Sequence, residues 1–203
     1  MLSFCQNIVR LLSSVAPRRG SNTEPDNNTY MPKGELVPLR TAQIGRCGEL
    51  LVQYLLLLRG IESAPMSTDS GIDLVAYSPT TAYPATIQVK TNLKGKPGGG
   101  KGKLSLDWWL PEETPAQLMA LVDLSSQRVW MLRVSEVPSL AQQKSNGRFH
   151  LCMSIDPTLR PRKLNRLAFV YEFEKYLLDN RAHELFGISP AVPVDSPASR
   201  ARR

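Results

Sequence analysis

Two short stretches of alternating apolar and polar residues, at 71–77 and 86–91, constrain the fold of this chain more than any other feature. Each has the period of two that is typical of a half-buried β-strand. The first places Asp73 on one of its faces, and the second places Gln88 and Lys90 together on one face. The segment between them is rich in Pro, Thr and Ser, which predicts a hairpin connection. Such a hairpin would gather a carboxylate, an amide and an ammonium on one surface, where a divalent cation and a water could be held against a phosphate.

Composition limits the class of protein. The 203 residues are enough for one domain with a real core, and 42% hydrophobic with 21% charged residues indicates a globular chain. The formal net charge of +7 favours a polyanionic partner, either nucleic acid or a membrane surface. Three scattered cysteines without a CxxC pair favour a reducing compartment, and we expect a cytoplasmic protein. The apolar runs are too short to span a bilayer. Of the two polyanionic partners, we expect nucleic acid and no membrane.

The ends of the chain differ in composition from its middle. We expect residues 1–38 to form a disordered N-terminal segment and linker, and residues 188–203 a disordered basic tail. The folded domain would then cover residues 39–187. The first 23 residues carry arginines and serines but no acid, so a mitochondrial transit peptide is the alternative to a disordered tail.

A helix is predicted over Thr41–Arg59, with Gly60 as its stop. Its apolar face is expected to consist of Ile44, Cys47, Leu51, Tyr54, Leu55 and Leu58. Gly48 lowers helix propensity, and a close packing contact would explain its presence.

The rest of the chain predicts further strands and a closing helix. The basic, glycine-rich run at 92–103 is expected to be flexible. Strands are expected in LMALVDL, in RVWMLRVSEV after a turn at Ser125–Ser126, and in RFHLCMSI. A helix is predicted over Asn165–Leu185, with one face made of Leu167, Val170, Tyr171, Glu174 and Leu178. This order predicts an α/β fold with a central mixed β-sheet flanked by helices.

The order of Glu49 on the first helix, then Gly71-Ile72-Asp73, then Gln88-Val89-Lys90, resembles the PD-(D/E)XK nuclease superfamily in its Q-x-K variant. The resemblance extends over roughly residues 41–186 and implies a restriction-endonuclease-like fold. Each motif is short, so the resemblance rests on their order and spacing.

The resemblance implies roles for five residues. Asp73 would be the principal ligand of Mg²⁺ or Mn²⁺, with the Gln88 amide oxygen and the Val89 carbonyl completing the set. Lys90 would orient the attacking water or stabilise charge on the phosphate, and Glu49 would support the metal or the lysine. Gln88 stands where the family usually has an acid, which lowers the negative charge of the site and leaves Glu49 to supply a second carboxylate.

Each of these residues has a simpler interpretation. Asp73 would also fit as a solvated acid at a strand end, and Gln88 and Lys90 as the polar face of an edge strand. Glu49 lies at the margin of the predicted apolar face, so it would also fit as a charged residue on the helix surface. Basic residues that would contact a nucleic-acid backbone, or simply form solvated surface, are Lys94, Lys96, Lys101, Lys103, Arg160, Arg162, Lys163 and Arg166. Trp108 and Trp109 follow the first four, either as further contacts or as a core pair.

The resulting expectation is a metal-dependent DNA endonuclease that hydrolyses phosphodiester bonds as a homodimer or higher oligomer, because two strands need two active sites. The first alternative is a catalytically inactive nucleic-acid-binding module on the same fold. A structural or interaction protein, whose basic charge serves another partner, is the second.

Overall fold

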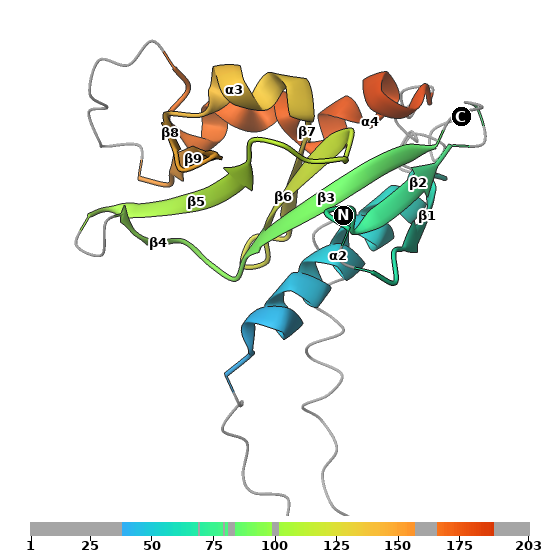
Figure 1. Ribbon diagram of the computed structural model, residues 1–203, viewed down its shortest axis with the longest axis horizontal. Helices are drawn as coiled ribbons and strands as arrows, with labels where there is room; N and C mark the ends of the chain where they lie inside the picture. The colour runs from blue at the N-terminus through green and yellow to red at the C-terminus, as the bar shows by residue number, and fades with distance from the viewer. Residues whose placement is uncertain are drawn as a thin grey trace, which may run out of the picture. The chain divides into compact units, whose positions relative to one another are not determined.

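The computed structural model describes residues 38–68, 70–78, 80, 84–98, 102–156 and 166–188, and its helices and strands belong to one compact unit that begins at Leu39. A five-stranded sheet lies at its centre, in the order β1-β2-β3-β6-β7 (Figure 1). Its strands are β1 Glu62–Pro65, β2 Leu74–Tyr77, β3 Ala85–Asn92, β6 Leu118–Asp123 and β7 Arg128–Arg133. The mixed sheet with flanking helices confirms the predicted α/β class.

The pairing of this sheet follows the two predicted hairpins. β2 and β3 are antiparallel, with Leu74 opposite Ile87, and β6 and β7 form the second antiparallel hairpin. β3 and β6 are parallel, so the chain leaves the sheet between them. Every residue of β6 is buried, as expected for a strand that is covered on both faces.

A second, four-stranded antiparallel sheet is formed mainly by the segment between β3 and β6 and the segment after β7. Its order is β4-β5-β9-β8, with β4 Lys96–Pro97, β5 Leu104–Pro111, β8 Gln143–Ser145 and β9 Arg148–Ser154. Only β9 was predicted. The expectation that 92–103 is flexible was wrong in part, because β3 continues to Asn92 and β4 pairs with the start of β5.

The two faces of the central sheet cover separate apolar cores. One face packs against α2 and α4, through side chains such as Val52 and Phe186. The other packs against the second sheet, α3 and the 3₁₀-helix η3, through side chains such as Trp108 and Phe173. Among the described residues, no helix is long and apolar enough to cross a membrane.

Helix α2 extends over Thr41–Leu57, close to its predicted bounds, but it buries a different face. Gly48, Val52 and Leu56 are buried, whereas Tyr54 and Leu58 are 54% and 64% exposed. The buried face is rotated relative to the predicted one: Leu51 and Leu55 still pack against the core, but Tyr54 and Leu58 do not. Four consecutive leucines place an apolar group on every side of the helix, so the pattern alone does not fix the face. The contact at Gly48 decides the orientation: a Cβ there would lie 1.9 Å from Thr91 Oγ1 on β3, so only glycine allows this approach.

The predicted closing helix is two elements. After the short η2 (Val134–Glu136) and α3 (Val137–Leu140), the chain forms β8 and β9, then η3 over Val170–Tyr176 and α4 over Leu178–Phe186. Leu177 is extended between them and bridges to Trp130 of β7. A single helical stripe from Leu167 to Leu178 was therefore wrong, because a tertiary contact with the sheet edge interrupts the helix.

Candidate active site

The chain changes direction at Asp73, immediately before β2. Its N–H donates to the Ile87 carbonyl of β3 (2.9 Å), but its carbonyl accepts from the Met66 N–H on the opposite side (2.9 Å). In a regular strand both groups of one residue point to the same neighbour, so regular pairing ends here. The carboxylate continues it instead: Asp73 Oδ2 accepts a hydrogen bond from the Val89 N–H at 2.6 Å. Asp73 is thus fixed against the middle residue of the Gln88-Val89-Lys90 triplet.

Gln88 lies on β3 next to this kink, and its side chain reaches Gly71. It is only 7% exposed, and its Oε1 has no hydrogen-bond partner. Its Nε2 is 3.9 Å from the position that a Cβ on Gly71 would occupy, and Pro115 lies at 3.2 Å from the same point. Gly71 has a φ of 79°, which favours glycine. A buried amide oxygen without a partner is costly, and sites that bind ions are a recurrent reason to keep one.

Lys90 shares a face of β3 with Gln88. Their partners on β6, Leu121 and Met119, both belong to the core on the side of the second sheet. Lys90 is partly buried, and within the part of the chain that the structure describes its ammonium takes part in no ion pair. Asn92, the last residue of β3, donates to the Asp107 carbonyl of β5 at 2.9 Å and ties the two sheets together beside this face.

Glu49 lies on α2, which packs against the face of the central sheet opposite to Gln88 and Lys90. Gly48 contacts Thr91, so the next residue lies at the level of the end of β3. Gln53, one turn further on, donates to the Ser63 carbonyl of β1, which places this side of α2 toward β1 and β2. The Glu49 carboxylate is 24% exposed and pairs with Arg46 at 2.7 Å. The structure therefore joins Asp73 directly to the triplet, whereas Glu49 lies on α2 at the other face of the sheet and pairs with Arg46.

The donors at this site are oxygens: the Asp73 carboxylate, the Gln88 Oε1 and the Val89 carbonyl, which points to the same side of β3 as its N–H. Oxygen ligands are those that Mg²⁺ and Mn²⁺ prefer, and Mg²⁺ commonly needs only one or two carboxylates because it keeps several waters. Among the described residues no three His, Cys, Asp or Glu side chains gather into a metal site. The donor set fits a cation that is weakly held and largely hydrated.

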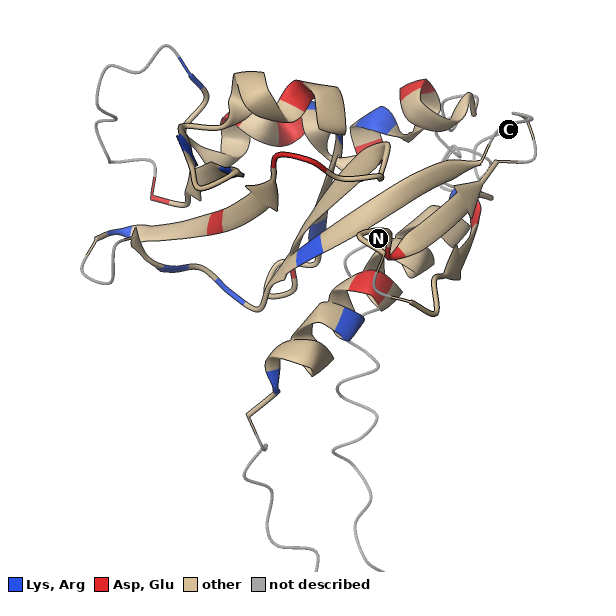
Figure 2. Ribbon diagram, in the orientation of Figure 1, with Lys and Arg blue, Asp and Glu red and all other residues tan. Residues whose placement is uncertain are grey.

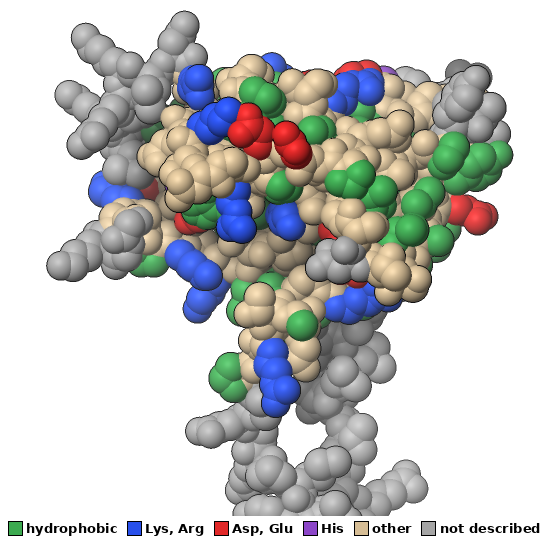
Figure 3. All heavy atoms as spheres, viewed as in Figure 1, with side chains coloured by type: hydrophobic (Ala, Val, Ile, Leu, Met, Phe, Trp, Pro, Cys, Tyr) green, Lys and Arg blue, Asp and Glu red, His purple; other side chains and the backbone are tan. Residues whose placement is uncertain are grey.

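The basic residues predicted to contact nucleic acid lie partly beside this site. Lys94 and Lys96 are exposed between β3 and β5, and Lys103 pairs with Asp156 at 3.3 Å. Figure 2 shows basic positions on β3 and on the segment that leads from it through β4, and Figure 3 shows basic side chains spread over the same face. Lys101, Arg160, Arg162 and Lys163 lie outside the described residues. Arg166 donates to the Ala141 carbonyl.

The two tryptophans have separate roles, which the sequence did not reveal. Trp108 is 4% exposed and packs edge-on against Trp130 in the core. Trp109 points to the other side of the sheet and is 44% exposed. The alternation LSLDWWL in β5 carried this signal, since it puts Trp108 on the apolar side and Trp109 with Ser105 and Asp107.

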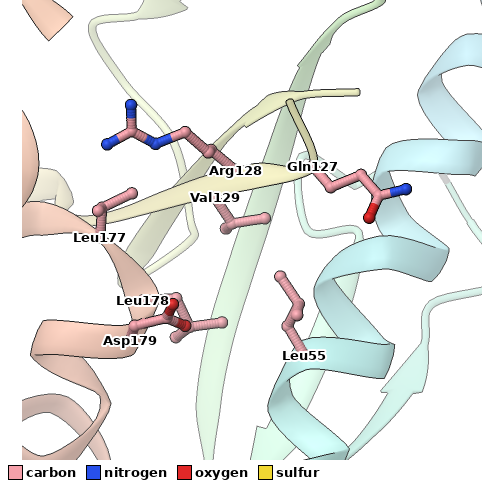
Figure 4. Close-up of a pocket in the computed structure, with 7 residues that line it drawn as sticks. All are labelled: Leu55, Gln127, Arg128, Val129, Leu177, Leu178 and Asp179. Atoms are coloured by element: carbon pink, nitrogen blue, oxygen red, sulfur yellow. The ribbon is translucent and has the colours of Figure 1, made fainter. Parts of the chain in front are cut away.

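A small hollow of about 100 Å³ lies away from the site, between the end of α2, the β6–β7 turn and the start of α4 (Figure 4). Leu55, Val129 and Leu178 face one another across it. Arg128 and Gln127 point to opposite sides, and Arg128 pairs with Glu174. Asp179 also lines the hollow, but its carboxylate pairs with Arg59. Because both charged lining residues are already paired, the hollow is a packing gap.

The densest polar cluster also lies elsewhere, between β7, η2 and α4. Arg181 is 5% exposed and forms paired hydrogen bonds to Glu136 at 2.7 and 2.6 Å, and others to Glu184 and the Met131 carbonyl. Burial alone would raise the pKa of Glu136, but hydrogen bonds from Arg181 and the Arg133 N–H hold it below its usual value. The hydrogen bond from Arg181 likewise lowers the pKa of Glu184.

The sequence matches no protein-family model and no curated protein. A solved structure of a bacterial homing endonuclease, I-Ssp6803I, is similar over 73% of this chain and 92% of that chain, with 14% identity and a TM-score of 0.45.

Proposed function

We propose that this protein is a metal-dependent DNA endonuclease whose active site lies where β2 begins beside β3. The observation that carries the proposal is the hydrogen bond from the Val89 N–H to Asp73 Oδ2, which joins the acid to the Gln88-Val89-Lys90 triplet. The two neighbours of Val89 flank that bond: the Gln88 Oε1 has no hydrogen-bond partner and the Lys90 ammonium no ion pair in the described part of the chain. This combination of acid, neutral oxygen and cation is suited to holding a phosphodiester and its counter-ion.

Each residue has a distinct part in the proposed reaction. Asp73, the Gln88 Oε1 and the Val89 carbonyl would hold Mg²⁺ or Mn²⁺, which when bound supplies positive charge to the phosphate and lowers the pKa of a water. Lys90 lies beside them and would stabilise the negative charge that develops on the phosphoryl oxygens. The Asp73 carboxylate is held by the Val89 N–H, so it is oriented before substrate arrives. Glu49 would add charge from α2 once released from Arg46.

A catalytically inactive nucleic-acid-binding module is the second candidate, and one observation favours it. Among the described residues, the carboxylate that is hydrogen-bonded to the triplet is that of Asp73, while Glu49 is already paired with Arg46 at 2.7 Å. A site with one carboxylate binds a divalent cation weakly. In that case Lys90, Lys94 and Lys96 would serve as phosphate contacts without cleavage.

Nicking of supercoiled plasmid in Mg²⁺ or Mn²⁺ tests the proposal. The native chain should cut, and Lys90→Ala should lower the rate on the order of a hundredfold, because one electrostatic contact to the transition state is lost. Lys175→Ala, an exposed lysine on η3, is the matched control and should cut normally. Metal-independent DNA binding without any cutting by the native chain would replace the endonuclease with the binding module.

We further propose that the active form is a homodimer, because two strands require two sites. The outward face of α2 offers a surface for the second copy: Leu50, Tyr54, Leu57 and Leu58 recur at helical spacing and are each more than half exposed. An antiparallel pairing of two such helices is self-complementary and lies next to Glu49. Linear plasmid at early times of the cutting assay, together with a sedimentation mass of two chains, would support the homodimer. A sedimentation mass of one chain under the assay conditions would exclude it.

A further inference from the structure

Trp109 stands out on the outer face of the second sheet. It is 44% exposed, whereas the other two tryptophans of the described chain, Trp108 and Trp130, are 4% and 0% exposed. A large aromatic ring that is left accessible to solvent forgoes a substantial burial energy, which is typical of rings that bind a ligand.

The ring of Trp109 is held rigidly. Its partner across β9 is His150, and the two rings stack with centroids 4.4 Å apart and an interplanar angle of 13°. The Asp107 carboxylate lies on the same face, 3.7 Å from the His150 Nε2. Since the ring is oriented in advance, little side-chain entropy would be lost when a second planar group stacks on it.

Trp109 faces a groove of about 400 Å³. The groove is lined by Trp109, Ser145, Asn146 and Arg148. The last three belong to the β8–β9 hairpin, where Asn146 and Gly147 both have positive φ, 49° and 68°, the geometry of a tight two-residue turn. This turn is fixed to the end of β5 by a hydrogen bond from the Glu112 N–H to the Gly147 carbonyl.

Arg148 supplies the charge of the groove. The neighbouring Lys144 is already engaged, since it pairs with Glu112 and lies over the Phe149 ring at 5.5 Å. Arg148 is exposed, and no ion pair is found for it among the described residues. The groove therefore combines a fixed aromatic ring, a guanidinium, and the Ser145 and Asn146 side chains as hydrogen-bonding groups.

We propose that this groove binds an unpaired nucleotide of the DNA substrate, with the base stacked on Trp109 and its phosphate on Arg148. A planar ring with an adjacent cation matches the two chemical parts of a nucleotide, and stacking accepts any base because each has a π-face. The inference rests on the proposed function only in taking DNA as the ligand. It predicts a contact to single-stranded or frayed DNA that is separate from the Asp73 site.

Trp109 itself reports on this contact. With the native chain in EDTA, where no metal-dependent cutting occurs, addition of a single-stranded oligothymidine should quench the solvent-accessible tryptophan emission. A blunt duplex of the same length should quench it less. Trp109→Ala should weaken single-strand binding measured by anisotropy about tenfold, since stacking contributes about 1–3 kcal/mol per base. Arg148→Ala should also weaken single-strand binding. It should make the slope of log affinity against log salt concentration shallower by about the amount of one phosphate contact.

Tyr171→Ala is the matched control. Tyr171 is 57% exposed and also stacks on a neighbouring ring, Phe169, but it lines no groove with Arg148. Its removal should leave oligonucleotide binding unchanged. Equal affinity of the native chain and both groove variants would overturn the inference, even if Lys90→Ala abolishes nicking. Conversely, Trp109-dependent binding by a chain that never cuts would retain this groove and reject the endonuclease.

Discussion

Two polar clusters, one at the edge strand β7 and one at β3 inside the central sheet, differ in how completely their groups are bonded. Around Arg181, two carboxylates, a backbone carbonyl and the Tyr176 ring at 5.1 Å surround one guanidinium. Around Gln88, a buried oxygen has no partner and the nearby Lys90 ammonium has no ion pair among the described residues. The first arrangement stabilises the fold. The second costs stability, and such a cost is understandable where a ligand completes the bonding.

The largest effect on stability is expected from the Arg181 cluster. Arg181→Met should lower the free energy of unfolding by about 2–3 kcal/mol, toward the lower end of the range for breaking a buried pair, because both carboxylates reach solvent. Urea denaturation with linear extrapolation measures this. Arg133→Met is the control: it pairs with Glu184 at the surface, with side chains 45% and 50% exposed, and should cost less than about 1 kcal/mol. Equal losses for the two variants would contradict the assignment.

The sequence predicted the Gln88 cluster better than the Arg181 cluster. The residues of the Gln88 cluster belong to two neighbouring stretches joined by a predicted hairpin. Their alternation of apolar and polar residues is a local pattern, and it predicts which side chains share a face. Glu136 and Arg181 are far apart in the chain and meet only because η2 and α4 pack against the edge of β7. No local pattern encodes that meeting. The kink at Asp73 was not predicted either, because it depends on a hydrogen bond from Met66, the residue that follows β1.

The same distinction explains the fold-level differences. The five strands of the central sheet have local signals or follow from pairing, but the buried face of α2 depends on the Gly48–Thr91 contact, which the Leu55–Leu58 run conceals. β5 alternates as well, but no strand was predicted there, because the segment directly follows the glycine- and lysine-rich run. The break at Leu177 depends on a bridge to Trp130. Where tertiary contacts override local pattern, the sequence predicts the element but not its face or its end.

A smaller effect is expected on the pH dependence of stability. Glu136 has a folded-state pKa below its ordinary value of 4.5, so the unfolded chain binds a proton more readily than the folded one. The stabilisation is therefore complete above the unfolded pKa and is lost as the pH falls through the folded pKa. Glu136→Gln should be less stable than the native chain near neutrality, and the difference should narrow below about pH 4.5. A difference that stays constant down to about pH 3 would mean that Glu136 does not contribute by its charge.

The smallest change in stability is expected at Gln88. Comparing Gln88 with Gln142 tests directly whether a buried amide without partners differs from one that is fully hydrogen-bonded. Gln142 is fully bonded: its Nε2 donates to the Cys152 and Leu167 carbonyls at 2.9 and 2.7 Å, and its Oε1 accepts from the Cys152 N–H at 2.7 Å. Gln142→Met leaves those backbone groups unpaired and should cost about 2 kcal/mol, with normal plasmid nicking.

Gln88→Met removes an oxygen that has no partner in the folded chain and keeps nearly the same volume beside Met119. Its free energy of unfolding should stay the same or rise by up to about 1 kcal/mol, because an unpaired buried acceptor is replaced by an apolar group. The metal concentration needed for cutting should nevertheless increase, since one oxygen donor is lost. Gln88→Glu should lower that concentration by adding a charge. A Gln88→Met chain that is destabilised as much as Gln142→Met, yet cuts at native metal concentrations, would show that Gln88 is a structural residue and would move the proposed donor set away from it.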